Sequence, residues 1–295
     1  MKRKMCLLLC VIAILVSACS AVHKSLHPDL ITDSLEVHLI SIIPQDSIKI
    51  NIVESMYDGF GLLEVLIDDV IDRESYISAN ELLSSFNRKT RNVDFKSMYW
   101  KKLENTFSQS KKMVYNEFEK KNEYSEAEFK EINKPYLKFE TDYELSPNAR
   151  AILIITKAEL YITDSKKPDY YGDYVYISDM IAGGKELSIP QALELWHEND
   201  NAKYREILNE GIEQNMFMFK HDLLDRFDGK FSESSKKVRM LFYSPSHGYH
   251  EDLYGKLVLE DDKRIIVRRR GDLFIRGGNL FSIGKGSIHS FIIYD

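Results

Sequence analysis

All three cysteines of the chain lie within its first nineteen residues. This segment begins with a basic Lys-Arg-Lys stretch, continues as an apolar run from Met5 to Val16 and ends with small residues. That order of regions is typical of a secretory signal peptide, which is removed from the mature protein. Loss of residues 1–18 leaves Cys19 as the last cysteine. We therefore expect the mature chain to fold on an apolar core alone, without a disulfide.

The residues around the expected cleavage point indicate a lipid anchor. Directly before Cys19 stand Val16, Ser17 and Ala18. This tetrapeptide resembles the lipobox of bacterial lipoproteins, in which an aliphatic residue and two small residues precede a cysteine. The resemblance implies that a signal peptidase recognises these three residues, that the Cys19 thiol receives diacylglycerol, and that the new amino terminus is acylated, for example with palmitate. The alternative is an ordinary secretory signal followed by a chance cysteine.

The apolar run itself is too short to span a bilayer, which takes about 20 apolar residues. Downstream, the longest apolar stretches are strand-sized, such as that from Ala151 to Thr156. Two or more acyl chains give stable membrane attachment, whereas one gives only reversible binding. We therefore expect a permanent tether through Cys19. Among enteric lipoproteins an aspartate after the cysteine marks retention in the inner membrane, so Ser20 favours the outer membrane.

Composition narrows the class of partner. The signal segment contains basic residues and no acidic ones, so the mature chain is more acidic than the net charge of −6 of the whole chain. An acidic surface argues against a nucleic-acid partner, because phosphate contacts need clustered lysines and arginines. With 44% hydrophobic and 12% aromatic residues, the chain has the composition of a globular protein rather than of a disordered stalk.

Residues 19–33 are polar and predict a short tether, and residues 34–227 predict an α+β domain. In residues 34–53, alternating apolar residues around a Pro-Gln-Asp-Ser turn predict a β-hairpin, with His38 on its solvent face. Helical spacing predicts helices over the ranges 74–87, 95–109, 188–198 and 201–227, with Asp94 as the N-cap of the second. Strand patterns over 136–144, 150–163 and 173–177 favour an antiparallel meander.

Residues 228–237 predict a linker, and residues 238–295 contain short strands separated by regular turns. We expect a barrel or sandwich in this part. The predicted fold class is therefore α+β, with an antiparallel sheet and packed helices followed by a small all-β C-terminal domain.

Two groups of residues suggest metal ligands, each with a simpler interpretation. Glu64, Asp68 and Asp72 are spaced by four residues, which places three carboxylates in one row of a helix; they form either a divalent-cation site or an acidic solvated face. His247 and His250 lie beside two acidic residues, as zinc ligands or as part of a polar loop. Since the polar interpretation suffices for both groups, we predict no metal site and no cofactor.

The remaining motifs that could indicate a binding or catalytic site also have simple structural interpretations. The run from Lys263 to Arg270 is basic and favours either a lipid-phosphate or acidic-protein contact, or protection of a strand edge from aggregation. The glycine-rich residues 277–286 lack the spacing and the following helix of a phosphate-binding loop. His197 and His221 lie among apolar residues and are predicted to pack rather than to catalyse. The sequence therefore predicts no catalytic residue.

Beyond the lipobox, the chain resembles a group of proteobacterial lipoproteins of unknown function in scattered pieces over residues 55–225. The resemblance rests on a Gly-Leu-Leu helix entry at Gly61, a Leu-Ser-Pro turn at Leu145 and a helix bearing Trp196. It implies an envelope location but indicates no particular activity. We expect a lipid-anchored, non-enzymatic binding or structural protein of the bacterial envelope, whose partner is an envelope protein or the cell wall. The alternative is a periplasmic hydrolase acting on peptidoglycan or lipid.

Overall fold

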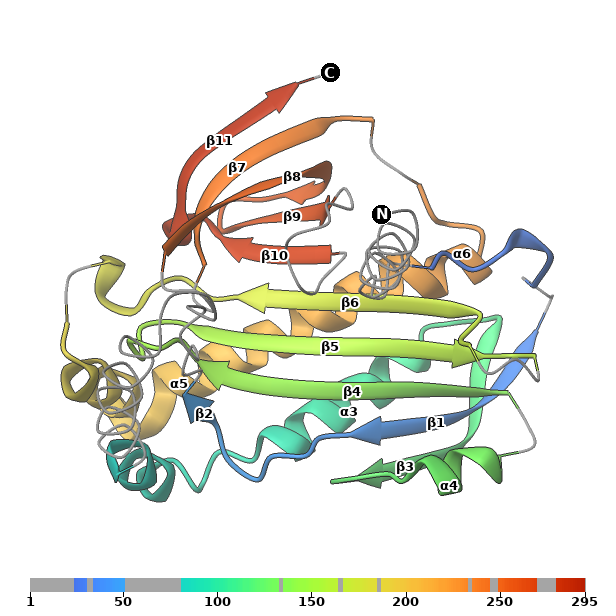
Figure 1. Cartoon of the computed structure of the whole chain (residues 1–295), viewed down its shortest axis with the longest axis horizontal. Helices are drawn as coiled ribbons and strands as arrows, with labels where there is room; N and C mark the ends of the chain where they lie inside the picture. The colour runs from blue at the N-terminus through green and yellow to red at the C-terminus, as the bar shows by residue number, and fades with distance from the viewer. Residues whose placement is uncertain are drawn as a thin grey trace, which may run out of the picture.

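Figure 1 shows the computed structural model of the chain. It describes residues 24–30, 34–50, 81–132, 135–163, 167–184, 187–232, 235–244, 249–269 and 280–294. The predicted signal peptide and lipid-attachment site, the Glu64–Asp72 row and His247 lie outside these described residues.

The described strands form one 11-stranded mixed sheet in the order β11-β7-β8-β9-β10-β6-β5-β4-β1-β3, and β2 pairs with β4 beside this path. Their bounds are β1 (Leu35–Ile42), β2 (Lys49–Ile50), β3 (Met113–Lys121), β4 (Tyr136–Leu145), β5 (Ile152–Tyr161), β6 (Tyr170–Ile177), β7 (Lys237–Ser244), β8 (Tyr249–Glu260), β9 (Arg264–Arg269), β10 (Leu280–Gly284) and β11 (Ile288–Tyr294). The predicted meander is present as the antiparallel run β4-β5-β6.

The predicted fold class is wrong in two respects. First, the sheet contains parallel pairs, namely β1 with β3, β1 with β4, β2 with β4, and β6 with β10. Second, β10 joins the strands after residue 237 to the rest of the sheet, because Leu280 pairs with Tyr174 and Ile283 with Ile177. All five residues of β10 are buried. β10 therefore has a partner strand on each side, β6 and β9. The strands after residue 237 continue the same sheet and do not form the predicted small all-β domain.

The predicted N-terminal hairpin is also wrong. β1 lies between β3 and β4 and is parallel to both. The short β2 follows the predicted turn but pairs with Glu144 and Leu145 of β4 instead of with β1. β1 is buried over nearly its whole length, as is usual for a strand inside a parallel arrangement.

The described helices and helical turns are a helix over 81–89, α3 (Phe95–Phe107), α4 (Glu126–Lys130), α5 (Ile189–Phe219), the π-helical turn η3 (Lys220–Leu224), α6 (Asp225–Phe227) and the 3₁₀ turns η1 (Pro28–Leu30), η2 (Ile181–Gly184) and η4 (Lys285–Ser287). Asp94 caps α3 by accepting a hydrogen bond from the backbone of Ser97, as predicted. The helix predicted over 188–198 and the longer one after it form α5, which is broken where Asn199, Asp200 and Asn201 have positive φ.

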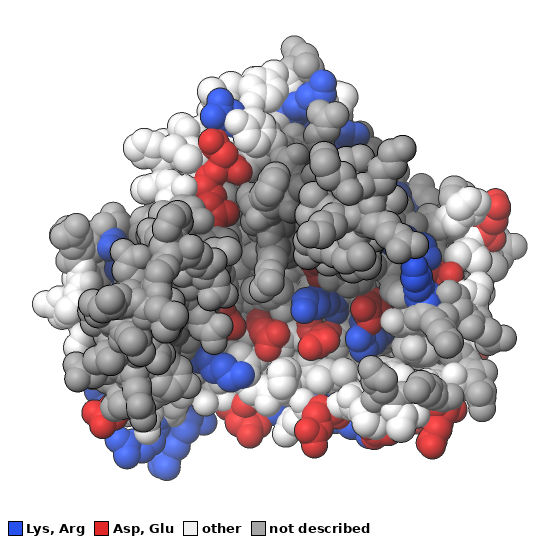
Figure 2. Space-filling model, in the orientation of Figure 1, with Lys and Arg blue, Asp and Glu red and all other residues white. Residues whose placement is uncertain are grey.

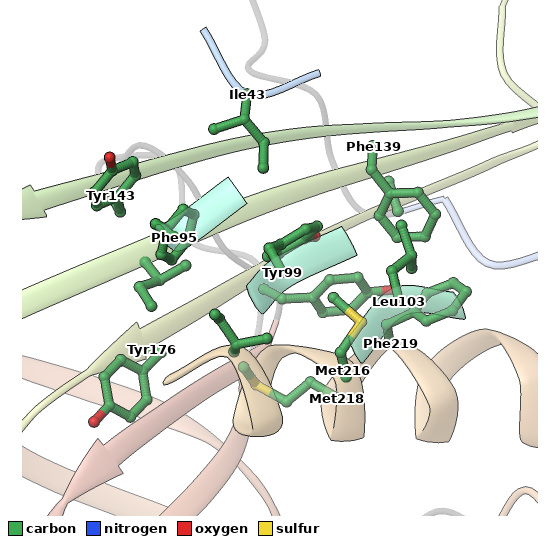
Figure 3. Close-up of a cluster of buried hydrophobic side chains, with 14 of the residues drawn as sticks. Ile43, Phe95, Tyr99, Leu103, Phe139, Tyr143, Tyr176, Met216, Met218 and Phe219 are labelled. Atoms are coloured by element: carbon green, nitrogen blue, oxygen red, sulfur yellow. The ribbon is translucent and has the colours of Figure 1, made fainter. Parts of the chain in front are cut away.

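α3 and α5 cover one face of the sheet, and Figure 3 shows the core between them. Phe95, Tyr99 and Leu103 of α3 point toward the sheet and toward side chains of α5. Phe95 stacks on Tyr143 of β4 with ring centroids 3.9 Å apart. A second apolar cluster lies among strands β6 to β10, with β11 packed against it. None of the described helices is both long enough and apolar enough to cross a membrane.

The opposite face of the central strands carries charge. Figure 2 shows acidic and basic side chains side by side across the middle of this view. On β4 and β5 they alternate with buried residues, and Lys138 forms a 2.5 Å ion pair with Glu159.

Candidate functional site

A pocket of about 610 Å³ opens at the β3 end of the sheet. Its walls come from β1, β3 and the segment between β3 and β4, which contains α4. The lining residues are His38, Glu119, Lys121, Tyr124, Glu128, Glu131 and Ile132. The pocket thus collects one imidazole, three carboxyl groups, one ammonium group and one phenol within a short stretch of surface.

His38 lies at the floor of this pocket. It is only 4% exposed, so its predicted place on the solvent face is wrong. The register between β1 and β3 shifts by one residue at this point: Val37 pairs with Tyr115, whereas His38 pairs with Glu117. Such irregularities re-aim side chains and occur next to functional sites. The shift places the imidazole beside the acidic residues of β3.

Two carboxylates approach the imidazole. Nε2 of His38 lies 2.8 Å from Oε1 of Glu119. Glu117 stands two residues earlier on the same strand, and one ligand atom each from His38, Glu117 and Glu119 lies within 4.8 Å of the others. Neither ring nitrogen of His38 makes a hydrogen bond of good geometry, although buried polar groups are normally satisfied.

The rim of the pocket carries a second layer of charge. Lys121 lies 3.2 Å from Oε2 of Glu119 and 3.6 Å from Oε1 of Glu128. The hydrogen bond to Glu119 raises the pKa of Lys121. Glu128 accepts hydrogen bonds from the backbone and the hydroxyl of Ser125 in the capping box that begins α4, and these bonds lower the pKa of Glu128. Lys121 and Glu128 are therefore both charged at neutral pH, and Lys121 holds Glu119 through Oε2.

Aromatic rings continue from the pocket along the sheet. Tyr124 contacts Phe129, which stacks on Tyr136, which stacks on Tyr161, with centroid separations of 4.3, 5.8 and 4.5 Å. Burial raises the pKa of Tyr136 to about 12. These rings form an apolar wall beside the charged pocket and fix the position of α4 above the sheet.

A second polar cluster lies inside the molecule, where the π-helical turn η3 meets β6 and β9. Asp222 is fully buried. It accepts a 2.6 Å hydrogen bond from the hydroxyl of Tyr170 and forms ion pairs with Arg268 at 2.8 Å and Arg226 at 3.4 Å. Tyr174 hydrogen-bonds to Tyr170. π-helical turns frequently mark functional positions, but this cluster is enclosed, and its partners satisfy the buried charge.

The far end of the sheet is an exposed strand edge. Among the described strands, β11 pairs with β7 alone. Ile292, Ile293 and Tyr294 are 53%, 40% and 40% exposed. Tyr254 on β8 is exposed to the same degree. Figure 1 shows β11 projecting from the molecule at this end.

The residues singled out in the sequence fall in different places. His250 is exposed and contacts the rings of Tyr243 and His289. His197 packs through a 2.6 Å contact with the side chain of Asn201. His221 lies between Phe217 and Phe231, and burial lowers its pKa. The structure brings none of these three histidines into a common site.

The basic run splits between the interior and the surface. Arg264 is buried and Arg268 is nearly so, because both pair with buried carboxylate or hydroxyl partners. Glu117 and Glu119 were not predicted as site residues, since the lysine-rich segment around them has no clear strand pattern. The signal available was the alternation of Glu117, Glu119 and Lys121, which places three charges on one face of a strand.

No protein-family model, curated protein or solved structure matches the chain.

Proposed function

We propose that this chain is a lipid-anchored protein of the bacterial envelope, held in the outer membrane by acyl groups on Cys19, which acts by binding another envelope protein and not as an enzyme. The lipobox-like Val16-Ser17-Ala18 before Cys19 supports the anchor. The β11 edge supports the binding role and carries the proposal.

An exposed strand edge presents unpaired backbone N–H and C=O groups to any extended chain nearby. Natural proteins usually protect such edges with charges, proline or covering segments. β11 instead exposes Ile292, Ile293 and Tyr294. Addition of an extended segment to a sheet edge gains backbone hydrogen bonds, and alternate side chains give specificity. The partner class is therefore a protein that offers an extended segment within reach of the membrane.

Site-specific photo-crosslinking in the native cell tests the binding role. A photoreactive amino acid replaces Ile292 on β11 in one variant and Lys203 on α5, which is also exposed, in a matched control. We expect a discrete crosslinked species at position 292 that is absent at position 203. Equal crosslinking at both positions, or co-sedimentation with cell-wall sacculi that does not depend on β11, would overturn the assignment of this edge to a protein partner.

Metabolic labelling tests the anchor separately. The wild-type chain is expected to incorporate labelled palmitate and to sediment with outer membranes. Cys19→Ser removes the acceptor thiol and is expected to abolish both labelling and the shift in mobility that follows signal cleavage. Labelling that persists in Cys19→Ser would show that Cys19 is not the acceptor.

A hydrolase acting on peptidoglycan or lipid is the second candidate, and the His38 pocket is the observation that favours it. A buried imidazole beside two carboxylates that open to solvent is an arrangement suited to activating water. The test is whether the wild-type chain hydrolyses purified sacculi or phospholipid and whether Glu119→Gln loses that activity. Such a result would assign the protein as a hydrolase in place of the binding role.

A further inference from the structure

The side chains around His38 form a complete donor set for a transition-metal ion. His38 offers an imidazole nitrogen, and Glu117 and Glu119 each offer a carboxylate oxygen, all within 4.8 Å of one another. Protein zinc sites place nitrogen and oxygen ligands about 2.0–2.2 Å from the ion. The three ligand atoms therefore lie close enough together to share one ion.

The burial of His38 is the independent observation. A side chain that is 4% exposed and whose two ring nitrogens lack a well-formed hydrogen bond leaves polar atoms unsatisfied, which is costly in a protein interior. The imidazole is held at the pocket floor by the register shift beside Val37. Nε2 lies beside Oε1 of Glu119, whereas Nδ1 has no hydrogen-bond partner among the described residues. A bound cation would take the lone pair of one of these nitrogens.

Charge at the site also favours a cation. Glu117 and Glu119 project from the same face of one strand, and Glu128 and Glu131 lie further out in the pocket. Lys121 holds Oε2 of Glu119, and this contact orients the carboxylate so that Oε1 points at His38. Partners of this kind fix ligand carboxylates in known metal sites.

The donor types narrow the choice of ion. Calcium and magnesium prefer oxygen-only ligand sets. Imidazole combined with carboxylates suits zinc and related divalent transition metals. A site with three protein ligands and an open position is the arrangement in which zinc binds water or substrate. Here the open position faces the pocket of about 610 Å³.

We propose that His38, Glu117 and Glu119 bind one Zn²⁺ ion whose remaining coordination positions face this pocket. The ion ties β1 to the edge strand β3. This site lies at the opposite end of the sheet from β11, so the proposal does not depend on the proposed function.

Metal titration of the full chain in detergent tests the proposal. After chelation of bound metal, isothermal titration with Zn²⁺ is expected to show one saturable site, together with a rise in melting temperature, because a ligand that binds the folded state stabilises it. Glu117→Gln and Glu119→Gln keep side-chain size and are each expected to weaken zinc binding by at least about tenfold. Glu36→Gln, on the exposed side of β1, is the matched control and should bind as the wild type does.

X-ray absorption at the zinc edge of the loaded wild-type chain gives a test that needs no variant. We expect a shell of nitrogen and oxygen neighbours near 2.0–2.1 Å that contains a single imidazole, without sulfur near 2.3 Å. A sulfur shell would place the ion on a cysteine, and several imidazoles would place it on exposed histidines. Either result, an absent saturable site, or unchanged affinity in both glutamine variants overturns the proposal.

Discussion

The hydroxyl of Tyr170 donates a 2.6 Å hydrogen bond to the fully buried carboxylate of Asp222. This bond connects β6 to the π-helical turn at the end of α5. The same carboxylate pairs with Arg268 of β9 across the sheet. One buried acidic group therefore links the end of α5 to β6 and β9, the two strands that flank β10.

Replacing the carboxylate should be strongly destabilising. Asp222→Asn leaves the guanidinium of Arg268, which is 10% exposed, without its anionic partner, and breaking a buried ion pair by removing one partner costs about 3–5 kcal/mol. Urea unfolding measures the loss. Asp252→Asn on the exposed Arg239 pair is the control and should cost no more than about 1 kcal/mol. Similar losses in the two variants would show that the buried pair contributes little.

Gly172 allows the two tyrosines to meet. A Cβ atom at this position would lie 2.6 Å from the hydroxyl oxygen of Tyr174 and closer still to that of Tyr170. Both hydroxyls are held by hydrogen bonds and are fully buried. Gly172→Ala is therefore expected to lower the free energy of unfolding by about 1–3 kcal/mol. Adding Tyr174→Phe to that variant removes one clashing atom and should recover part of the loss; an additive double variant would contradict the explanation.

The N-cap residue of α3, Asp94, is expected to make a pH-dependent contribution to the free energy of unfolding. Hydrogen bonds from the side chain and backbone of Ser97 hold the pKa of Asp94 below its ordinary value. Since the folded pKa is the lower one, this stabilisation is fully present above the unfolded pKa near 3.9 and is lost as the pH falls through the folded value. Asp94→Ala should cost about 1 kcal/mol at pH 7.

The measurement is the difference in unfolding free energy between the wild type and Asp94→Ala from pH 7 to pH 2. This difference should shrink below about pH 4. Asp94→Asn retains a capping oxygen and does not titrate, so it should remain close to the wild type at neutral pH. A difference that stays constant down to pH 2 would exclude the carboxylate as its source.

Local elements of this fold were predictable because their signals are local. The Asp94 cap and the break near Asn201 both depend on a few neighbouring residues. The apolar stripe of α5 was likewise readable, because a helix that docks on a sheet repeats its apolar positions regularly.

Strand partners were not predictable, because partners of parallel strands lie far apart in sequence. The pairing of Leu280 with Tyr174 has no local signal in the sequence. Short strands separated by regular turns have the same sequence pattern whether they form a separate barrel or continue an existing sheet. The candidate site was missed for the same reason. His38 meets Glu119 only because β3, a polar strand in a lysine-rich segment, pairs in parallel with β1.

Arg264 connects the strands after residue 237 to the rest of the sheet. Its side chain is 3% exposed. It donates hydrogen bonds to Glu210 of α5 at 2.5 Å, to the Tyr176 hydroxyl at 2.9 Å and to the Ile177 backbone carbonyl at 3.2 Å. Arg264→Met leaves buried acceptors on β6 unsatisfied, and we expect a loss of about 3 kcal/mol.

Hydrogen exchange decides whether the strands after residue 237 unfold with the rest. Because β10 pairs with β6 and Arg264 bridges β9 to both β6 and α5, strands β5 and β9 should lose protection in one cooperative event in the wild type. Arg264→Met weakens that connection and should lower protection in β9 before β5. If β9 already exchanges separately in the wild type, the division at residues 228–237 is a true domain boundary, and neither the β6–β10 pair nor the Arg264 contacts couple the unfolding of the two parts.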